Sequence, residues 1–190
     1  MVWFREYFLL LQPNQISLFM NTKPSPPLPA RAKPAHESPK HFFNNTPLLF
    51  ITVCAHNRKP VFASPKAHAS IVQAWSEATY WSVGRYVCMP DHIHFFCTPA
   101  VWKYPAITTW IKYWKSLVSK KWPQKSDQPL WQRDFWDTQL RRQESYRYKW
   151  DYVRNNPVRA GLVNHADAWP YQGELHPIEW IGDYIKNKKY

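Results

Sequence analysis

The order of strand and helix patterns along the chain is the feature that most restricts its fold. Residues 46–57, "TPLLFITVCAHN", predict a strand buried on both faces, and residues 81–90 and 91–99 predict two more strands joined by a short Met-Pro-Asp turn. Residues 64–81 and 104–122 carry apolar residues at helical spacing. Residues 130–140 predict a fourth strand, and a last helix over residues 143–156 ends before Pro157.

Strand, helix, strand, strand, helix, strand is the order of a split βαβ unit. We therefore predict an α+β fold: a ferredoxin-like antiparallel sheet with an appended C-terminal helix. The second helix should bury Ile107, Ile111, Trp114 and Val118. For the first helix, the predicted inner face is Ala69, Val72, Trp75 or Ser76, and Thr79.

Composition shifts divide the chain into three predicted regions. The stretch "TKPSPPLPARAKPAHESPK" is proline-rich and has no apolar period, so residues 1–44 are expected to be a solvated, disordered leader. Residues 45–165 are expected to form the folded domain. Residues 166–190 would pack on it as an extension with a basic tail.

The charge balance indicates a polyanionic partner. Lys plus Arg number 25 against 13 Asp plus Glu, a formal net charge of +12, and the pI is about 9.7. Nucleic acid is the expected ligand, and the 17% aromatic content could supply rings that stack on unpaired bases. Three cysteines without a CxxC pair argue against a zinc ribbon and a disulfide framework, and no apolar run reaches the roughly 20 residues of a membrane span. We expect a cytoplasmic protein.

Two histidines stand one residue apart in "CMPDHIHFF". In a strand, His92 and His94 project from the same face. A surface alternation would leave both rings in water, with Ile93 and Phe95 facing the core. Alternatively, two neutral imidazoles on one face can hold a divalent cation.

The last predicted helix carries the other reactive groups, in "WDYVRNNPVRAG". Tyr152 and Asn156 are four residues apart and would share a helical face. An amide oxygen would complete the cation site, and a tyrosine beside it could attack a phosphorus atom to give a covalent phosphotyrosine. Spacing alone leaves Tyr146 and Tyr148 as competing nucleophiles.

The motifs "MPDHIHFF" and, about sixty residues later, "YKWDYVRNNPVRAGLV" resemble those of the single-tyrosine HUH transposases. The stretches "LWQRDFWDTQLRRQESYRYKW" and "ADAWPYQGELHPIEW" are most similar to the REP-associated tyrosine transposases within that group. The resemblance implies that His92, His94 and Asn156 are metal ligands and that Tyr152 is the nucleophile. Asp91 departs from the Asn or Glu that the family often has before the first histidine.

The resemblance also implies a reaction and its partners. Single-stranded DNA would be cut beside a hairpin, of the repetitive extragenic palindrome (REP) type, in the presence of Mg²⁺ or Mn²⁺. The tyrosine would keep the 5′ phosphate, so that strands can be rejoined. Such a protein would act on bacterial nucleoid DNA as a monomer or homodimer. A basic clamp for the DNA backbone is expected from Lys112, Lys115, Lys120, Lys121, Arg141, Arg142, Arg147 and Arg154.

Four other functions fit parts of the sequence. The protein could bind hairpins without catalysis, and the lysines of residues 104–122 could be no more than a solvated helix face. It could be the transposase of a mobile insertion sequence. A replication initiator or relaxase would share the chemistry but is generally larger. An RNA-binding domain of this fold would need an aromatic pattern on its central strands that Tyr86, Phe95 and Phe96 do not make.

Overall fold

The computed structural model describes residues 46–140 and 143–178, together with His36 and Pro39. Most of the predicted leader, Arg141, Arg142 and the basic tail lie outside these residues. His36 stacks on Phe135, with ring centroids 4.1 Å apart, and its Nδ1 lies 2.6 Å from Asp137 Oδ1. None of the helices in the described ranges combines the length and apolarity needed to cross a membrane.

The sheet has the predicted antiparallel, ferredoxin-like topology. Its strands are β1 (Leu48–Ala55), β2 (Trp81–Cys88), β3 (His92–Pro99), β4 (Trp131–Leu140) and β5 (Gln172–Glu174), in the order β4-β1-β3-β2-β5. Every neighbouring pair is antiparallel. The α+β prediction is confirmed. The three-residue β5 extends the sheet beyond β2 and was not predicted, because three residues are too few to show a period.

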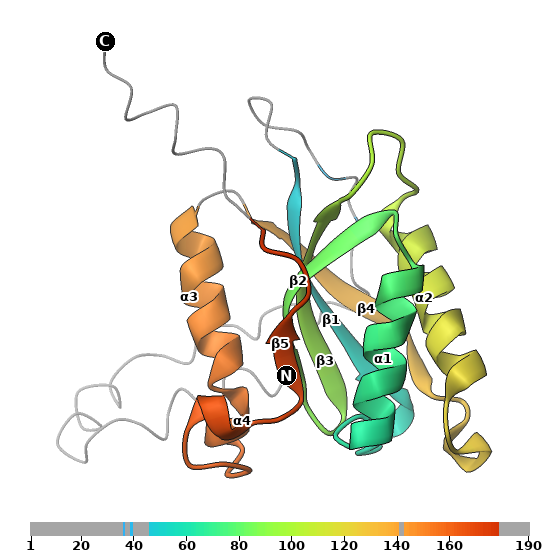
Figure 1. Cartoon of the computed structure of the whole chain (residues 1–190), viewed down its shortest axis with the longest axis vertical. Coiled ribbons are helices and arrows are strands. Elements are labelled where there is room, and N and C mark those ends of the chain that lie inside the picture. The colour runs from blue at the N-terminus through green and yellow to red at the C-terminus, as the bar shows by residue number, and fades with distance from the viewer. Residues whose placement is uncertain (1–35, 37–38, 40–45, 141–142, 179–190) are drawn as a thin grey trace, which may run out of the picture. The chain divides into compact units, whose positions relative to one another are not determined.

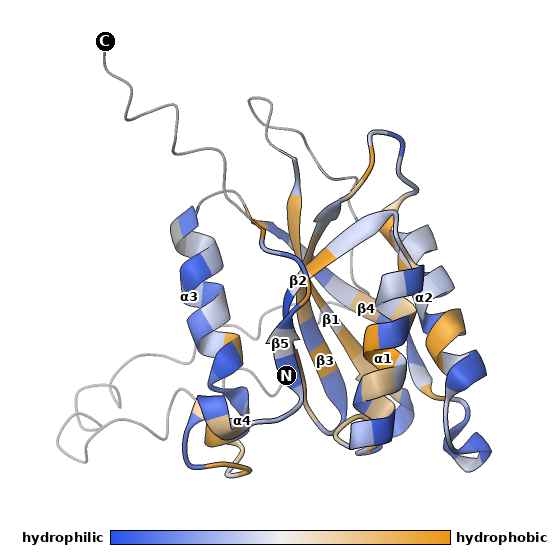
Figure 2. Ribbon diagram, in the orientation of Figure 1, coloured by the Kyte–Doolittle hydropathy of each residue, from blue (hydrophilic) through white to orange (hydrophobic). Residues whose placement is uncertain are grey.

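Helices α1 (Pro65–Glu77) and α2 (Ile107–Lys121) lie on one side of the sheet, and α3 (Gln143–Arg154) lies on the other (Figure 1). Ser64 caps the N-terminus of α1, and its hydroxyl accepts a hydrogen bond from the Ala67 backbone N–H. Pro65 follows as the first residue of the helix. Figure 2 shows that α3 is hydrophilic over much of its length, so its position depends on a few anchoring side chains.

The core between the sheet and the α1–α2 pair is built on large rings. Trp75 of α1 stacks on Trp114 of α2, with ring centroids 5.3 Å apart and planes 6° from parallel. The four apolar positions predicted for α2 are all buried. For α1 the predicted face was largely wrong: the buried residues are Ala67, Ile71, Ala74 and Trp75. Trp75 was placed correctly and Val72 is half-buried against the core, whereas Ala69, Ser76 and Thr79 are exposed. The apolar residues of α1 fit more than one helical phase.

The end of α3, the helix that carries Tyr152 (the tyrosine helix), also differs from the prediction. Helix α3 ends at Arg154, and Asn156 opens a separate short helix, α4 (Asn156–Arg159). Pro157 disfavours helical geometry in the residue before it and suits the first turn of a new helix. The four-residue step from Tyr152 to Asn156 therefore crosses a helix junction.

Candidate active site

Strand β3 carries both histidines on the side of the sheet that faces α3. Alternation along β1 sends Ile51 and Val53 into the α1–α2 core and leaves Phe50 and Thr52 on the α3 side. His94 pairs with Thr52, and His92 pairs with Cys54. The two imidazole rings lie with centroids 4.7 Å apart and planes 82° apart. The reading of the histidines as a water-exposed pair is wrong, because His94 is fully buried.

Each histidine is held through its Nδ1 atom. His94 Nδ1 lies 2.8 Å from Thr52 Oγ1, and the His94 ring stacks on Phe50. His92 Nδ1 donates to Asp91 Oδ1 at 2.6 Å, and Asp91 Oδ2 pairs with Arg58 Nε at 2.9 Å. A carboxylate on Nδ1 fixes the tautomer in which Nε2 of His92 is the nitrogen that could bind a cation. Asp91 thus acts as an orienting group for His92.

Burial and charge keep the His94 ring neutral. Its pKa is lowered well below the usual value, first by burial and then by electrostatic interactions with His92, Lys149, Arg58 and Arg159. Burial alone would raise the pKa of Asp91, but the hydrogen bond from His92 and the charges of His92 and Arg58 hold it below its usual value. Metal binding requires an unprotonated imidazole, and the lowered pKa of His94 favours that state.

Helix α3 is anchored over this face by two aromatic residues one turn apart. Tyr146 and Trp150 lie edge-on to Phe96 of β3, at centroid distances of 4.7 and 6.3 Å. Arg85 of β2 lies over both rings, 5.8 and 5.4 Å from their centroids. Tyr146 is therefore a buried packing residue, which makes it a poor nucleophile.

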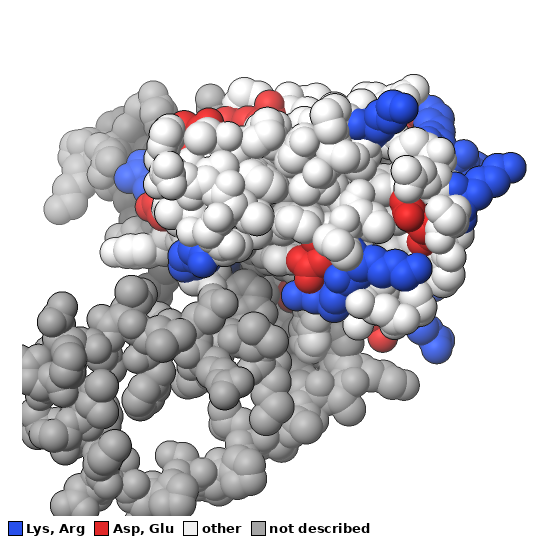
Figure 3. Space-filling view, turned by 90° about the horizontal axis from the view of Figure 1, so that it is seen from below, with Lys and Arg blue, Asp and Glu red and all other residues white. Residues whose placement is uncertain are grey.

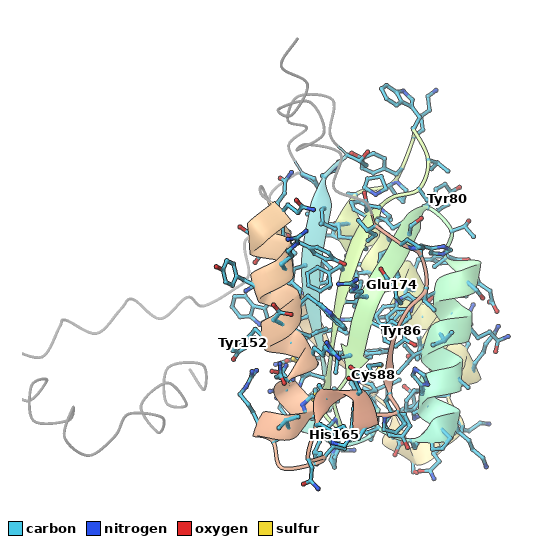
Figure 4. All side chains as sticks on the ribbon, turned by 60° about the vertical axis from the view of Figure 1, so that its left-hand side comes forward. Tyr80, Tyr86, Cys88, Tyr152, His165 and Glu174 are labelled. Atoms are coloured by element: carbon cyan, nitrogen blue, oxygen red, sulfur yellow. The ribbon has the colours of Figure 1, made fainter. Side chains whose placement is uncertain are left out.

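The Tyr152 side chain projects from the flank of α3, because Trp150 and Val153 occupy the inner face of the helix. Figure 4 shows it at the edge of α3, and 37% of its surface is exposed. The Arg159 guanidinium lies over the Tyr152 ring, 3.8 Å from its centroid, and donates to Asn156 Oδ1. Since Arg159 also contributes to the lowered pKa of His94, this one cation links the tyrosine, the amide and the histidine pair.

The donor groups fit a divalent cation in part. No cluster of three His, Cys, Asp or Glu residues suited to a metal occurs in the part of the chain that the structure describes. Two imidazoles are present, and the third donor would have to be the Asn156 amide oxygen. That oxygen accepts a hydrogen bond from Arg159, so the guanidinium would have to move before a cation could bind the two imidazoles and the amide together.

The predicted basic clamp is divided between the two sides of the sheet. The lysines of α2 lie on the side away from the histidines. Lys112 and Lys120 are exposed, whereas Lys121 pairs with Glu77 of α1. In Figure 3, Lys and Arg side chains form separate groups interrupted by Asp and Glu, with no continuous basic patch in that view.

Lys115 is the clearest exception among the predicted clamp residues. It is buried, and its Nζ donates to the Gln132 backbone carbonyl at 3.0 Å and lies 5.8 Å from the Trp131 ring centroid. Burial lowers its pKa to about 8. On α3, Arg147 is exposed, and Arg154 pairs with Asp167.

Sequence reasoning missed the cations that do lie on the histidine side. Lys149 Nζ is 5.1 Å from the centroid of Phe50, the residue that stacks on His94. Arg58, Arg159 and Arg85 also belong to this side, and Arg85 lies over the rings of Tyr146 and Trp150. Arg159 carried a usable signal, since it follows Asn156 by three residues in "NNPVRAG". Arg58 carried none, because its approach depends on the turn after β1, where Asn57 and Arg58 both have positive φ.

A ferredoxin-like sheet with paired histidines on a central strand, and a tyrosine helix over the same face, is the arrangement expected of single-tyrosine HUH transposases. Sequence similarity to known proteins points to one group within this class. The chain is 26% identical over 111 residues to the REP-associated tyrosine transposase of Escherichia coli K12, covering 54% of this chain. It is 29% identical over 114 residues to a Haemophilus influenzae protein of the same family name, covering 50% of this chain. The chain is thus similar in sequence to REP-associated tyrosine transposases.

The matched region spans 64% of the length of each of these relatives. A solved structure of a REP-associated tyrosine transposase bound to a REP hairpin has a TM-score of 0.57 and 23% identity, and the match covers 76% of this chain and 90% of that one. This likeness supports the fold. No family model matches the chain.

Proposed function

We propose that the protein cleaves and rejoins single-stranded DNA beside REP-type hairpins through a covalent link between Tyr152 and the 5′ phosphate. The observation that carries the proposal is the His92–His94 pair, with rings 4.7 Å apart on the face of the sheet under the tyrosine helix. The relatives' family name and the hairpin bound by the solved neighbour agree with it. A protein with this role would act at the nucleoid, in the cytoplasm.

Tyr152 is the nucleophile in this reaction. Its phenol oxygen bonds to phosphorus while the bond from phosphorus to the 3′ oxygen breaks. The phenol proton is lost, and the departing 3′ oxygen gains a proton. The 5′ phosphate stays on the tyrosine, so an incoming 3′-OH can reverse the step without another source of energy.

His92, His94 and Asn156 would hold Mg²⁺ or Mn²⁺. When bound, the cation would polarise the phosphate as a Lewis acid. Asp91 and Thr52 orient the two imidazoles. In the structure Arg159 contacts Asn156 and the Tyr152 ring. Its guanidinium would move from these contacts to a phosphate oxygen, because a guanidinium binds an anion more strongly than a neutral amide.

The test uses the full chain with labelled single-stranded DNA that carries a REP-type hairpin and an unpaired extension. We expect a denaturing gel to show a protein–DNA adduct with Mg²⁺ or Mn²⁺, none with EDTA, and at least a hundredfold less with His92→Ala or His94→Ala. The matched control is His68→Ala, since His68 is hydrogen-bonded to Tyr86 on the other side of the sheet. An adduct that survives EDTA and both histidine variants would contradict the proposal.

Binding without catalysis is a second candidate. It is favoured by the engagement of both Tyr152 and Asn156 by Arg159. In that case the protein would bind the hairpin with wild-type affinity after Tyr152→Phe and form no adduct with any metal.

A further inference from the structure

The histidine side of the sheet carries an exposed indole at its edge. Trp136 lies on β4, the edge strand, and 45% of its surface is exposed. Asp134 and Thr138, its neighbours on the same side of the strand, are exposed as well. An indole exposed to this extent on the face of an edge strand offers a flat apolar surface on which another ring can stack.

Strand register connects Trp136 to the candidate active site. Trp136 pairs directly with Thr52, and Thr52 pairs directly with His94. The three residues therefore form one row across β4, β1 and β3, with their side chains on the same face. Strands in a sheet are about 4.8 Å apart, which places the Trp136 and His94 backbones roughly 10 Å apart. A strand bound at the histidine pair could therefore place a neighbouring base at the indole.

The charges beside the row suit a nucleic acid strand. Lys149 lies over Phe50, whose ring stacks on His94, and Arg159 lies over the ring of Tyr152. A strand with its phosphate at these cations would bring a neighbouring base toward Trp136. An unpaired base can present its face to the indole, whereas bases inside a duplex are already stacked on both sides.

We propose that Trp136 is a stacking platform for an unpaired nucleobase next to the phosphate bound at the histidine pair. This inference rests on the proposed function for the identity of the ligand, single-stranded DNA. It adds a base-binding position, which does not depend on the chemistry of the tyrosine.

The test measures binding in EDTA, so that no cleavage is required. A REP-type hairpin with an unpaired extension is compared with the same hairpin lacking it, by fluorescence anisotropy. We expect Trp136→Ala to weaken binding of the extended hairpin at least about fivefold and to leave the blunt hairpin unchanged, while Trp136→Phe keeps most of the affinity. The matched control is Trp102→Ala, since Trp102 is 94% exposed but lies in the loop after the far end of β3.

A second readout identifies the stacked base. 2-Aminopurine is placed at successive positions of the extension, and its fluorescence should be quenched at one position in the wild type and recover in Trp136→Ala. Equal affinity of Trp136→Ala and wild type for the extended hairpin would overturn the inference. So would a change of oligomeric state in Trp136→Ala without a change in DNA affinity, since Trp136 would then belong to an interface between copies. Loss of binding in Trp136→Ala without a tyrosine adduct in any protein would keep the inference and reject the strand transfer.

Discussion

Thr52 and His94 face each other across the β1–β3 pair, and Thr52 Oγ1 lies 2.8 Å from His94 Nδ1. Both residues are buried. The hydroxyl fixes the orientation of an imidazole that burial keeps neutral. A threonine on the neighbouring strand thus orients the imidazole that we propose as a metal ligand.

Thr52→Val should loosen this arrangement. The variant keeps the side-chain shape but leaves His94 Nδ1 buried without the hydroxyl, which costs about 1–3 kcal/mol of unfolding free energy. Loss of an outer partner typically lowers metal affinity 10- to 100-fold, so we expect a decrease of that size in Mn²⁺ affinity by calorimetric titration. Thr52→Ser is the matched control and should stay near wild type. Unchanged Mn²⁺ affinity in Thr52→Val would show that the hydroxyl does not orient a ligand.

The salt dependence of DNA binding should separate the two groups of cations. Lys149→Ala removes a charge on the histidine side and should lower the slope of log affinity against log salt by about 0.7, the value for one contact to a single strand. Lys112→Ala removes an exposed charge on α2 and should leave the slope unchanged. Anisotropy titrations over a series of salt concentrations measure both slopes. If Lys112→Ala lowered the slope and Lys149→Ala did not, the DNA would bind on the α2 side, as the sequence predicted.

Lys115 should give the stability of the protein a distinct pH dependence. Its pKa falls from 10.5 to about 8 on folding, so between those pH values the unfolded chain holds a proton that the folded protein has released. This group therefore adds stability as pH rises through the window. Relative to Lys115→Met, the wild type should gain about 2 kcal/mol of unfolding free energy between pH 7 and pH 10. Urea unfolding at both pH values measures the gain. Lys112→Met on the same helix is the matched control and should show none.

The strands and the α2 core could be read from the sequence because their apolar residues are regular. The continuous apolar run of β1 requires burial on both faces, and the three- and four-residue steps in α2 leave little choice of buried face. The side on which each helix lies follows from topology. Both crossover helices of a split βαβ sheet cover one face, so the lysines of α2 had to lie away from the tyrosine helix.

The finer parts of the site depend on tertiary contacts that no local pattern carries. Thr52 was placed on the correct strand, but its hydrogen bond requires the register between β1 and β3. Lys115 has the spacing of a surface lysine, yet it reaches carbonyls of the edge strand β4. Arg159 meets Tyr152 only because the chain turns between α3 and α4.

The central claim is that Tyr152 carries the DNA, and locating the covalent bond tests it most directly. Protein treated with hairpin DNA and Mn²⁺ is digested with nuclease and protease, and the peptide bearing the residual nucleotide is sequenced by mass spectrometry. Tyr148 is the internal comparison, because it lies one turn earlier on α3 and is 76% exposed. The account predicts the nucleotide on Tyr152, with Tyr148→Phe labelled normally and Tyr152→Phe not labelled. A nucleotide on Tyr148, or labelling that persists in Tyr152→Phe, would contradict it.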